Sequence, residues 1–313
     1  RPTSMNDETT HRSGYCAIVG RPNAGKSTFL NQIMGIKLAI STHKPQTTRD
    51  RILGILNRPN GQICFVDTPG LHSAKGGINK YMVRQAEAAI QDADVILWMA
   101  EIQPKSDNPL SKGMERIHQL IEATGKPWVL ALNKVDRMQD KTKLLPQIAR
   151  WQEAFDPPCV VPISAQDNDY TEVLLEEIVA RMPAGPPLFP DEFLTDRSER
   201  YLTTETIREK AILETRDELP YAVAVTVDDF DETRREDPED PMVSIIATVH
   251  VEREGQKRIV VGERGKVIKR IAMRSRRDLR RLLGCRVYLD LFVRVTTDWS
   301  SKDARLKDLG YDV

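Results

Sequence analysis

GRPNAGKS, residues 20–27, is the stretch that decides the fold of this chain. It fits G-x-x-x-x-G-K-S, a loop whose backbone N–H groups and following helix surround phosphate oxygens. An apolar run at 15–19 precedes it and a helical pattern at 26–34 follows it, which is the strand, loop and helix order that the motif requires. The residues expected to contact a nucleotide here are Gly20, Arg21, Pro22, Asn23, Ala24, Gly25, Lys26, Ser27 and Thr28.

Two motifs predict how the phosphates and a magnesium ion are held. Lys26 would reach the β- and γ-phosphates, and the Ser27 hydroxyl would bind Mg²⁺. A second apolar run, 63–66, ends in Asp67-Thr68-Pro69-Gly70. Asp67 would hold the same ion through water, and the Gly70 N–H would face the γ-phosphate. The nucleotide contacts expected here are Asp67, Thr68, Pro69, Gly70 and Leu71.

The motif Asn133-Lys134-Val135-Asp136, which ends a third apolar run at 128–132, predicts which base is bound. The Asp136 carboxylate can accept hydrogen bonds from guanine N1–H and N2–H₂, a donor pair that adenine lacks. Lys134 would lie along the base, and Ser164-Ala165 would offer a backbone N–H to guanine O6. The predicted guanine contacts are Asn133, Lys134, Asp136, Ser164 and Ala165.

Two threonines and a leucine bear on hydrolysis. Thr47 and Thr48 lie roughly twenty residues past Lys26, and one of them would give a hydroxyl to Mg²⁺ when the γ-phosphate is present; the sequence leaves open which. Leu71 stands where other GTPases have a water-orienting glutamine, so we expect slow intrinsic turnover. Arg49 could reach the nucleotide, but we expect it at the surface or at the start of the next strand. The expected catalytic residues are Lys26, Thr47, Thr48 and Gly70, and the expected Mg²⁺ ligands are Ser27, Thr47, Thr48 and Asp67.

Composition limits the class of protein. The chain has 313 residues, which favours two domains, and 46 basic against 46 acidic side chains, so total charge indicates no partner. The four cysteines lack metal-ligand spacing and read as free thiols of a reducing compartment. No apolar run approaches the roughly 18–20 residues of a membrane span. We expect a cytoplasmic monomer with a disordered tail at 1–13, of which Arg1–Ser4 look like a cloning remnant.

Apolar runs alternate with helical patterns over 14–182. The runs lie near 15–20, 51–56, 62–67, 94–100, 128–133 and 159–163, and the helices near 26–34, 79–93, 110–124, 141–155 and 170–182. This alternation predicts an α/β domain with a mostly parallel, doubly wound sheet, whose motif-bearing loops gather at its carboxyl edge. Residues 183–190 contain four prolines, which predicts a semi-rigid linker.

Residues 191–313 have a different, α+β pattern. We expect a helix near 198–213, two antiparallel strands at 221–227 and 242–251, and a last strand at 286–295 with its valines and leucines on one face. Between the first two strands lies 228–240, in which eight of thirteen residues are acidic. We expect that segment to be a solvated loop.

A second functional motif, Gly262-Glu263-Arg264-Gly265, joins two apolar helical patterns. A G-x-x-G turn lets a nucleic-acid backbone approach closely, as in a KH domain. Ten Lys or Arg residues and two acids lie between Gly262 and Arg286, a basic concentration suited to phosphates. A solvated helix face with a plain helix–helix turn is the alternative. The RNA contacts expected are Gly262, Glu263, Arg264, Gly265, Lys266, Lys269, Arg270, Arg274, Arg277 and Arg281.

In order, the phosphate loop, Thr47-Thr48-Arg49, the Asp67 and Asn133 motifs and the G-x-x-G turn resemble the Era family of bacterial GTPases over nearly the whole chain. The resemblance implies a P-loop GTPase domain followed by a type II KH domain. It implies binding of GTP, GDP and Mg²⁺, with K⁺ as a candidate beside Asn23, and of the 3′ end of 16S ribosomal RNA during 30S maturation. It also implies peripheral association with the inner membrane. Glu263, a charge inside the turn, and Ala24, in place of a bulkier residue, depart from the family pattern.

Three alternatives remain open at this point. A P-loop ATPase or kinase would need a different base motif from the one around Asp136. A passive RNA-binding scaffold would hold GDP without turnover. A ribosome GTPase with tandem G domains would need a second phosphate loop, and the sequence has one. We expect instead a two-state switch, in which GTP orders the segments around Thr47 and Gly70 and the proline linker passes the change to the KH domain.

Overall fold

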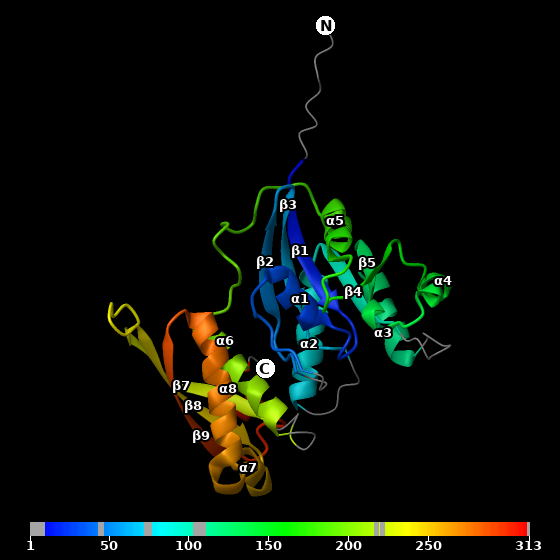
Figure 1. The fold of residues 1–313 in the computed structure, drawn as a ribbon. Coiled ribbons are helices and arrows are strands. Elements are labelled where there is room, and N and C mark those ends of the chain that lie inside the picture. The colour runs from blue at the N-terminus through cyan, green and yellow to red at the C-terminus, as the bar shows by residue number, and fades with distance from the viewer. Residues whose placement is uncertain are drawn as a thin grey trace. The chain divides into compact units, whose positions relative to one another are not determined.

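The computed structural model describes residues 10–42, 47–71, 77–102, 111–215, 219 and 223–311. Contacts divide the chain into two compact units, drawn in Figure 1. The first unit comprises 1–36, 51–72 and 85–196, and the second comprises 37–50, 73–84 and 197–313. This division differs from the continuous domains that we predicted, because two internal segments of the nucleotide-binding half make their contacts in the second unit.

The first unit has a six-stranded sheet in the order β2-β3-β1-β4-β5-β6. Every neighbouring pair is parallel except β2 and β3, which confirms the predicted mostly parallel sheet. Its strands are β1 (Arg12–Val19), β2 (Ile52–Arg58), β3 (Gly61–Asp67), β4 (Val95–Glu101), β5 (Trp128–Asn133) and β6 (Val160–Ile163). Because β1 starts at Arg12, the tail predicted through residue 13 is wrong at its last two positions; residues 1–9 lie outside the described ones.

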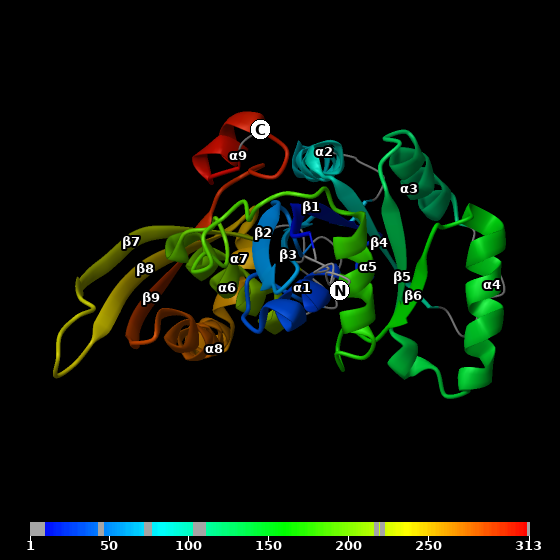
Figure 2. The same cartoon turned by 90° about the horizontal axis from the view of Figure 1, so that it is seen from above.

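Helices cover both faces of this sheet, as Figure 2 shows. Residues of α2, α3 and α4 pack with Trp98 of β4 in one buried apolar cluster, whereas α1 and α5 contact strands from the other side. Trp98 is fully buried, with the rings of Trp128, Trp151 and Phe155 around it. The helices are α1 (Lys26–Met34), α2 (Gly77–Asp92), α3 (Lys112–Glu122), α4 (Leu144–Phe155) and α5 (Thr171–Arg181), with 3-10 turns η1 (Val135–Arg137) and η2 (Lys141–Lys143).

The proline-rich segment is attached to the first unit. Gln62 of β3 is fully buried, and its Oε1 accepts hydrogen bonds from the Leu188 and Phe189 N–H groups at 2.7 and 2.9 Å. Its Nε2 donates to the Phe189 carbonyl at 2.8 Å, and farther on the Ile55 N–H donates to the Leu194 carbonyl at 2.9 Å. Because these hydrogen bonds fasten it at Leu188, Phe189 and Leu194, the segment 183–194 is held along the sheet and is not a free tether.

The second unit contains a three-stranded sheet in the order β7-β8-β9, antiparallel between β7 and β8 and parallel between β8 and β9. Helices α6, α7 and α8 pack over it around an apolar core that includes Ile207, Val249 and Leu279. This order of elements is that of the expected KH domain. The elements are α6 (Glu199–Glu214), β7 (Ala224–Arg234), β8 (Met242–Val251), α7 (Glu254–Val261), η4 (Glu263–Gly265), α8 (Lys266–Leu283), β9 (Arg286–Val295) and α9 (Asp303–Asp308).

The acidic stretch after Val227 is mostly strand, so the prediction of a loop over 228–240 is wrong for its first half. Strand β7 runs on to Arg234 and stays paired to β8 across two irregularities in register, after Val227 and after Asp231. Such bulges let acidic side chains remain in water while the backbone keeps its ladder. The sequence pattern hid this because the usual alternation of apolar and polar residues breaks where a strand bulges.

Candidate functional site

The predicted nucleotide motifs come together at one edge of the first unit's sheet. The phosphate loop follows β1, the Asp67 motif ends β3, the Asn133 motif ends β5, and Ser164-Ala165 follows β6. These strands run parallel, so their carboxyl ends meet at the same edge. The topology therefore brings the loops that carry the predicted phosphate, metal and base contacts to one edge, as expected for a parallel sheet.

The phosphate loop leads directly into helix α1. Gly25, at its end, has φ +100°, and a Cβ added there would lie 2.1 Å from the Asn133 Nδ2 atom, so only glycine fits. The Lys26 ammonium is buried and donates to the carbonyls of Gly20 and Arg21 at 3.3 and 3.2 Å. Burial lowers the pKa of Lys26, and the Asp67 carboxylate opposes that effect. The loop thus offers a cation and the positive end of the α1 helix dipole to an anion.

Asp67 has the features of a magnesium ligand. Its Oδ2 accepts a hydrogen bond from the Ser27 hydroxyl at 2.6 Å, while its Oδ1 is buried and has no hydrogen-bond partner among the described residues. Burial raises the pKa of Asp67 to about 6, against the opposing effects of Lys26 and Ser27. An unpaired carboxylate oxygen beside a hydroxyl is the oxygen donor set that Mg²⁺ takes, so the residues present fit that ion.

Asn133 joins the phosphate loop to the base-binding loops. Its buried amide donates from Nδ2 to the Ala24 carbonyl at 2.8 Å and accepts at Oδ1 from the Ala165 N–H at 2.9 Å. Its own carbonyl accepts from the Ile102 N–H at 2.9 Å. The asparagine is therefore structural, since each end of its side chain is occupied by protein. Its neighbours in the motif are left to contact the base.

The Asp136 carboxylate, which we predict to read the base, is exposed and already oriented. Ser164 donates from Oγ to Asp136 Oδ1 at 2.8 Å, which leaves Oδ2 and further lone pairs for a ligand. Lys134 has φ +71°, and its ammonium lies 2.9 Å from Glu101. Glu101, which also contacts Arg137 at 3.2 Å, was missed by sequence reasoning. The signal for it was an acid at the carboxyl end of β4, next to the strand that ends in Asn133.

The Leu71 side chain is buried in the apolar cluster around Trp98. Its N–H donates to the Gly20 carbonyl at 3.1 Å, so the residue fastens the Asp67 motif to the phosphate loop. A side chain in the core cannot orient a water molecule. This placement is the physical basis for the slow intrinsic hydrolysis that we predict from the missing glutamine.

Thr47, Thr48 and Arg49 make their contacts within the second unit. The Thr47 hydroxyl is 2.6 Å from that of Thr42, and which threonine binds Mg²⁺ stays a prediction. The expectation of a surface position for Arg49 is wrong. Its side chain is only 2% exposed, because the guanidinium packs against the rings of Trp299 and Tyr311. Gln46, which precedes Thr47, lies outside the described residues.

The G-x-x-G turn has the geometry of a backbone-binding turn. Gly262 ends α7 with φ +71°, Arg264 has φ +52°, and Gly265 precedes α8 with φ +74°. A Cβ on Gly262 would lie 2.3 Å from Val267 Cγ2, whereas one on Gly265 would have no neighbour closer than 3.9 Å. The start of α8 is therefore open to an approaching phosphate. The Lys266 ammonium lies 3.7 Å from Glu263, which offsets the acid inside the turn.

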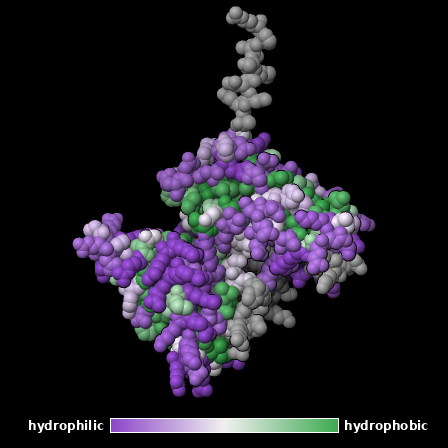
Figure 3. All heavy atoms as spheres, viewed as in Figure 1, coloured by the Kyte–Doolittle hydropathy of each residue, from purple (hydrophilic) through white to green (hydrophobic). Residues whose placement is uncertain are grey.

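Helix α8 exposes a basic face, in a region where hydrophilic residues dominate the surface (Figure 3). Its buried stripe is Ile271, Ser275, Leu279 and Leu283. Two predicted RNA contacts, Arg270 and Arg274, form ion pairs with the nearly buried Glu214 at 2.8 and 2.7 Å. Two of the predicted RNA-binding charges are therefore paired with an acid of the protein itself, although both arginines stay exposed. The exposed basic residues are Lys266, Lys269, Arg270, Arg274, Arg277, Arg280 and Arg281.

Two family profiles match the chain. One is described as a 50S ribosome-binding GTPase and matches residues 15–134; the other is described as a KH domain and matches residues 218–300. Among curated proteins, the chain is similar to GTPase Era of Geotalea uraniireducens (strain Rf4). The two are 46% identical over 305 residues, covering 97% of this chain and 99% of that relative.

Two solved structures are similar over nearly the full length. One is a variant of Aquifex aeolicus Era bound to GDP and AlF4⁻, with a TM-score of 0.89 and 36% identity, covering 96% of this chain and 100% of that one. The other is Era in complex with MgGDPNP and nucleotides 1506–1542 of 16S ribosomal RNA. Its TM-score is also 0.89 at 36% identity, covering 97% of this chain and 100% of that one.

Asp67→Asn removes the buried charge and should stabilise the protein free of nucleotide and Mg²⁺. Because burial raises the pKa of Asp67 from 3.8 to about 6, ionisation opposes folding; the penalty is absent below pH 3.8 and complete above about pH 6. We expect a gain of about 3 kcal/mol in unfolding free energy at pH 8 and little gain at pH 4. Urea unfolding at both pH values measures it, with the exposed Glu153→Gln as control. A loss of stability at pH 8 would contradict the burial argument.

Proposed function

Since this chain belongs to the GTPase Era family, we propose that it binds the 3′ end of small-subunit ribosomal RNA and acts in maturation of the 30S subunit as a GTP-driven switch. The chain is a GTP hydrolase with a P-loop GTPase domain and a KH domain. One observation carries the proposal: the motifs predicted to bind a guanine nucleotide, around Lys26 and Asp136, occur in one chain with a G-x-x-G turn and a basic helix. The related Era whose structure contains 16S RNA nucleotides 1506–1542 supports the choice of RNA.

Hydrolysis transfers the γ-phosphoryl group of GTP to water, giving GDP and phosphate. In our proposal the Lys26 ammonium and the N–H groups of the phosphate loop neutralise charge on the β- and γ-phosphates. Ser27, Asp67 and one of the two threonines would hold Mg²⁺, which would supply further charge neutralisation when bound. Asp136 would read the guanine. The Ala165 N–H, which we predicted to meet guanine O6, already donates to Asn133 Oδ1 at 2.9 Å. With Leu71 in the core, positioning and charge supply the rate.

Two alternative functions, an ATPase or kinase and a passive scaffold, make different predictions from the proposed switch. The Asp136 carboxylate, free to accept from guanine, argues against an ATPase or kinase. A passive scaffold that only holds GDP predicts no GTP turnover, either with or without RNA. Measuring GTP hydrolysis with and without a 16S 3′-end RNA separates it from the proposed switch, for which bound RNA alters the rate.

We extend the proposal to location and assembly. The protein would act in the cytoplasm as a monomer and touch the inner membrane peripherally. Among the described residues, no helix has the length and apolar character needed to cross a bilayer. The exposed basic face of α8, with Met273 58% exposed within it, supports reversible contact with anionic lipid.

Asp136→Asn should exchange the base preference. An amide donates where the carboxylate accepted, so it mismatches the guanine N2–H₂ but matches the O2 carbonyl of xanthine. We expect affinity for GTP to fall by about a hundredfold and affinity for XTP to rise, measured by fluorescent nucleotide titration. The matched control is Asp167→Asn, because that acid also contacts Ser164 (3.2 Å). Unchanged affinity for GTP would remove the role assigned to Asp136.

Gly265→Asp should weaken RNA binding by about tenfold, because it places a negative charge where a phosphate passes. Gly265→Asn is the matched control, since asparagine has the same size and tolerates the left-handed backbone but is neutral. Hydrolysis of GTP in the absence of RNA should be the same in both. Electrophoretic shifts with the 16S 3′-end sequence measure binding; equal affinity of the two variants would mean that RNA lies elsewhere.

We also propose that K⁺ binds beside Asn23 and assists hydrolysis. Asn23 lies in the phosphate loop with φ +65°. Its side-chain amide oxygen is a ligand that a monovalent cation can use. GTP hydrolysis should be faster in KCl than in NaCl at equal ionic strength. Asn23→Gly, which keeps the backbone conformation and removes the oxygen, should abolish the difference. Equal rates in the two salts for the parent protein would refute this role.

A further inference from the structure

The sheet of the second unit has two faces with different surroundings. Along β9, Val287 and Leu289 are buried in the apolar core that the sheet shares with α6, α7 and α8. Tyr288, Asp290 and Phe292 alternate with them and are exposed. Because successive side chains of a strand point to opposite faces, the exposed residues share the face away from these helices. We call it the outer face and define it by Asp229, Asp231, Ile246, Tyr288, Asp290 and Phe292.

The pairing of the strands arranges the outer face in rows. Asp229 of β7 lies opposite Ile246 of β8, and Ile246 lies opposite Asp290 of β9. Tyr288 and Phe292 stand on either side of Asp290 along β9. Side chains that are opposite or diagonal on neighbouring strands lie within reach of one another. Ile246 is therefore the centre of a patch in which carboxylates and aromatic rings alternate.

The apolar side chains of this patch are open to solvent. Ile246 is 36% exposed, and Tyr288 and Phe292 are each 53% exposed. Asp229 and Asp290 form no ion pair with another of the residues that the structure describes. An exposed apolar patch with a polar rim is typical of a protein–protein contact surface. Here the rim carries charge that is available to a partner.

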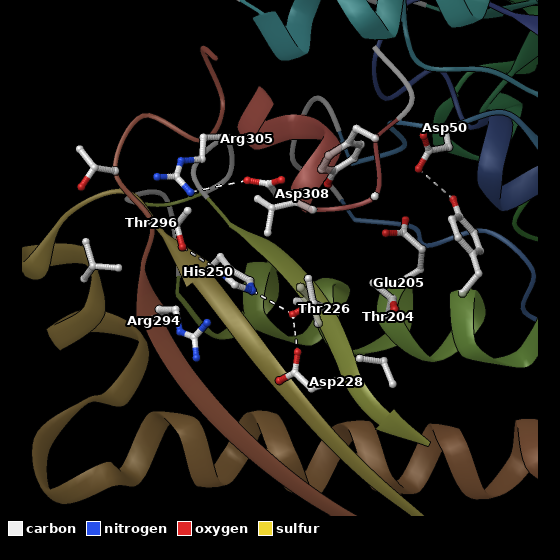
Figure 4. A pocket seen from close by; sticks show the side chains of 18 residues that line it. Asp50, Thr204, Glu205, Thr226, Asp228, His250, Arg294, Thr296, Arg305 and Asp308 are labelled. Atoms are coloured by element: carbon white, nitrogen blue, oxygen red, sulfur yellow. Dashed lines mark hydrogen bonds and ion pairs between the residues drawn. The ribbon is translucent and has the colours of Figure 1, made fainter. Parts of the chain in front are cut away.

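A further aspartate is held in place beside the outer face. Asp228 accepts hydrogen bonds from the hydroxyls of Thr226 and Thr248 at 2.9 and 2.6 Å. His250 lies 2.9 Å from the hydroxyls of both Thr226 and Thr296, and Figure 4 shows this row of side chains at a pocket of about 810 Å³. Burial lowers the pKa of His250, against the opposing effect of Asp228. The imidazole therefore adds no positive charge here at neutral pH.

Negative charge predominates on this side of the sheet. The three aspartates of the outer face and Asp228 stand against two arginines of β9, Arg286 and Arg294. Arg286 is already paired with Asp240. Helix α8, which packs against the other face of the sheet, exposes the basic residues predicted to contact RNA. The second unit therefore presents surfaces of opposite charge on its two sides.

The patch is also hollowed. A hollow of about 610 Å³ is lined by Asp228, Ile246 and Phe292, together with residues of α7. Two of these, Glu254 and Lys257, carry opposite charges and offset each other. The side chains that contribute most to protein interfaces fill such pockets, so the hollow is suited to anchor one side chain of a partner.

We propose that the outer face binds a lysine- or arginine-rich segment of another protein. Apolar side chains of that segment would cover Ile246, while its cations pair with the aspartates and lie over the rings of Tyr288 and Phe292. The phosphates of RNA or of an anionic lipid would meet carboxylates here, and so would the outer face of a second copy. Because α8 packs against the other face of the sheet, the segment can bind while RNA occupies the proposed site on α8.

The probe is a fluorescein-labelled synthetic peptide of alternating arginine and leucine, titrated with the full chain and followed by fluorescence anisotropy. A peptide of alternating glutamate and leucine is its charge-reversed control. One double variant, Asp229→Asn with Asp290→Asn, removes charge. Another, Tyr288→Thr with Phe292→Thr, removes the rings and keeps residues that favour a strand. All of these positions are exposed, so both variants should keep the melting temperature of the parent.

The matched control variant is Glu236→Gln with Glu239→Gln. It removes the same amount of charge from the connection between β7 and β8, outside the outer face, where both side chains are exposed. Affinity for the 16S 3′-end RNA and the sedimentation velocity are measured for every variant.

The arginine–leucine peptide should bind the parent, and added salt should weaken the binding. We expect its affinity to fall about tenfold in each outer-face variant and to keep the parent value in the control variant. The glutamate–leucine peptide should not bind. Affinity for RNA should equal that of the parent throughout, because the substitutions lie away from α8.

Three results would overturn the inference. The first is that the arginine–leucine peptide does not bind the parent, or loses as much affinity in the control variant, which would reveal a response to total charge alone. The second is a fall in RNA affinity in the ring variant with peptide affinity unchanged, which would assign the outer face to RNA. The third is self-association of the parent that the charge variant abolishes, which would assign the face to a second copy of this chain.

Discussion

The buried amide of Asn133 is the contact on which the nucleotide site depends. It joins the Ala24 carbonyl of the phosphate loop to the Ala165 N–H of the base loop, and Gly25 has no room for a side chain beside it. Because both ends of the amide are used, the separation between phosphate-binding and base-binding loops is set by the protein before any ligand arrives. Such preorganisation spares the binding step the cost of ordering these loops.

Charge is buried in both units, but with different consequences. Asp67 keeps one oxygen without a hydrogen-bond partner among the described residues, so that oxygen is available to a ligand, and the stability cost of the charge depends on pH. On α6, Arg208 and Glu205 satisfy each other, with the Thr47 carbonyl as a third participant. The first arrangement favours binding of a cation. The second favours a single position of a backbone segment and gains specificity more than stability.

The sequence predicted those features that depend on local pattern. The strand, loop and helix around residues 20–27, the motifs at strand ends and the helices flanking the G-x-x-G turn were all placed correctly. What it could not predict depends on partners far away in the chain. Arg49 is polar and lies in a polar stretch, so nothing nearby indicates Trp299 or Tyr311 as its surroundings. Gln62 fastens the proline-rich segment. It is a polar residue within an apolar strand, and its sequence does not indicate a partner until the neighbours of the strand are known.

The chain passes from one unit to the other at several points along its length, because 37–50 and 73–84 belong with residues 197–313. A fragment beginning at residue 197 would lack Ile78, Tyr81 and Met82, which pack with Trp299 and Leu306. It would also leave Glu209 without Lys37. The residues 197–313 alone are therefore an incomplete unit, and a cut at residue 197 exposes an apolar cluster that the intact chain covers.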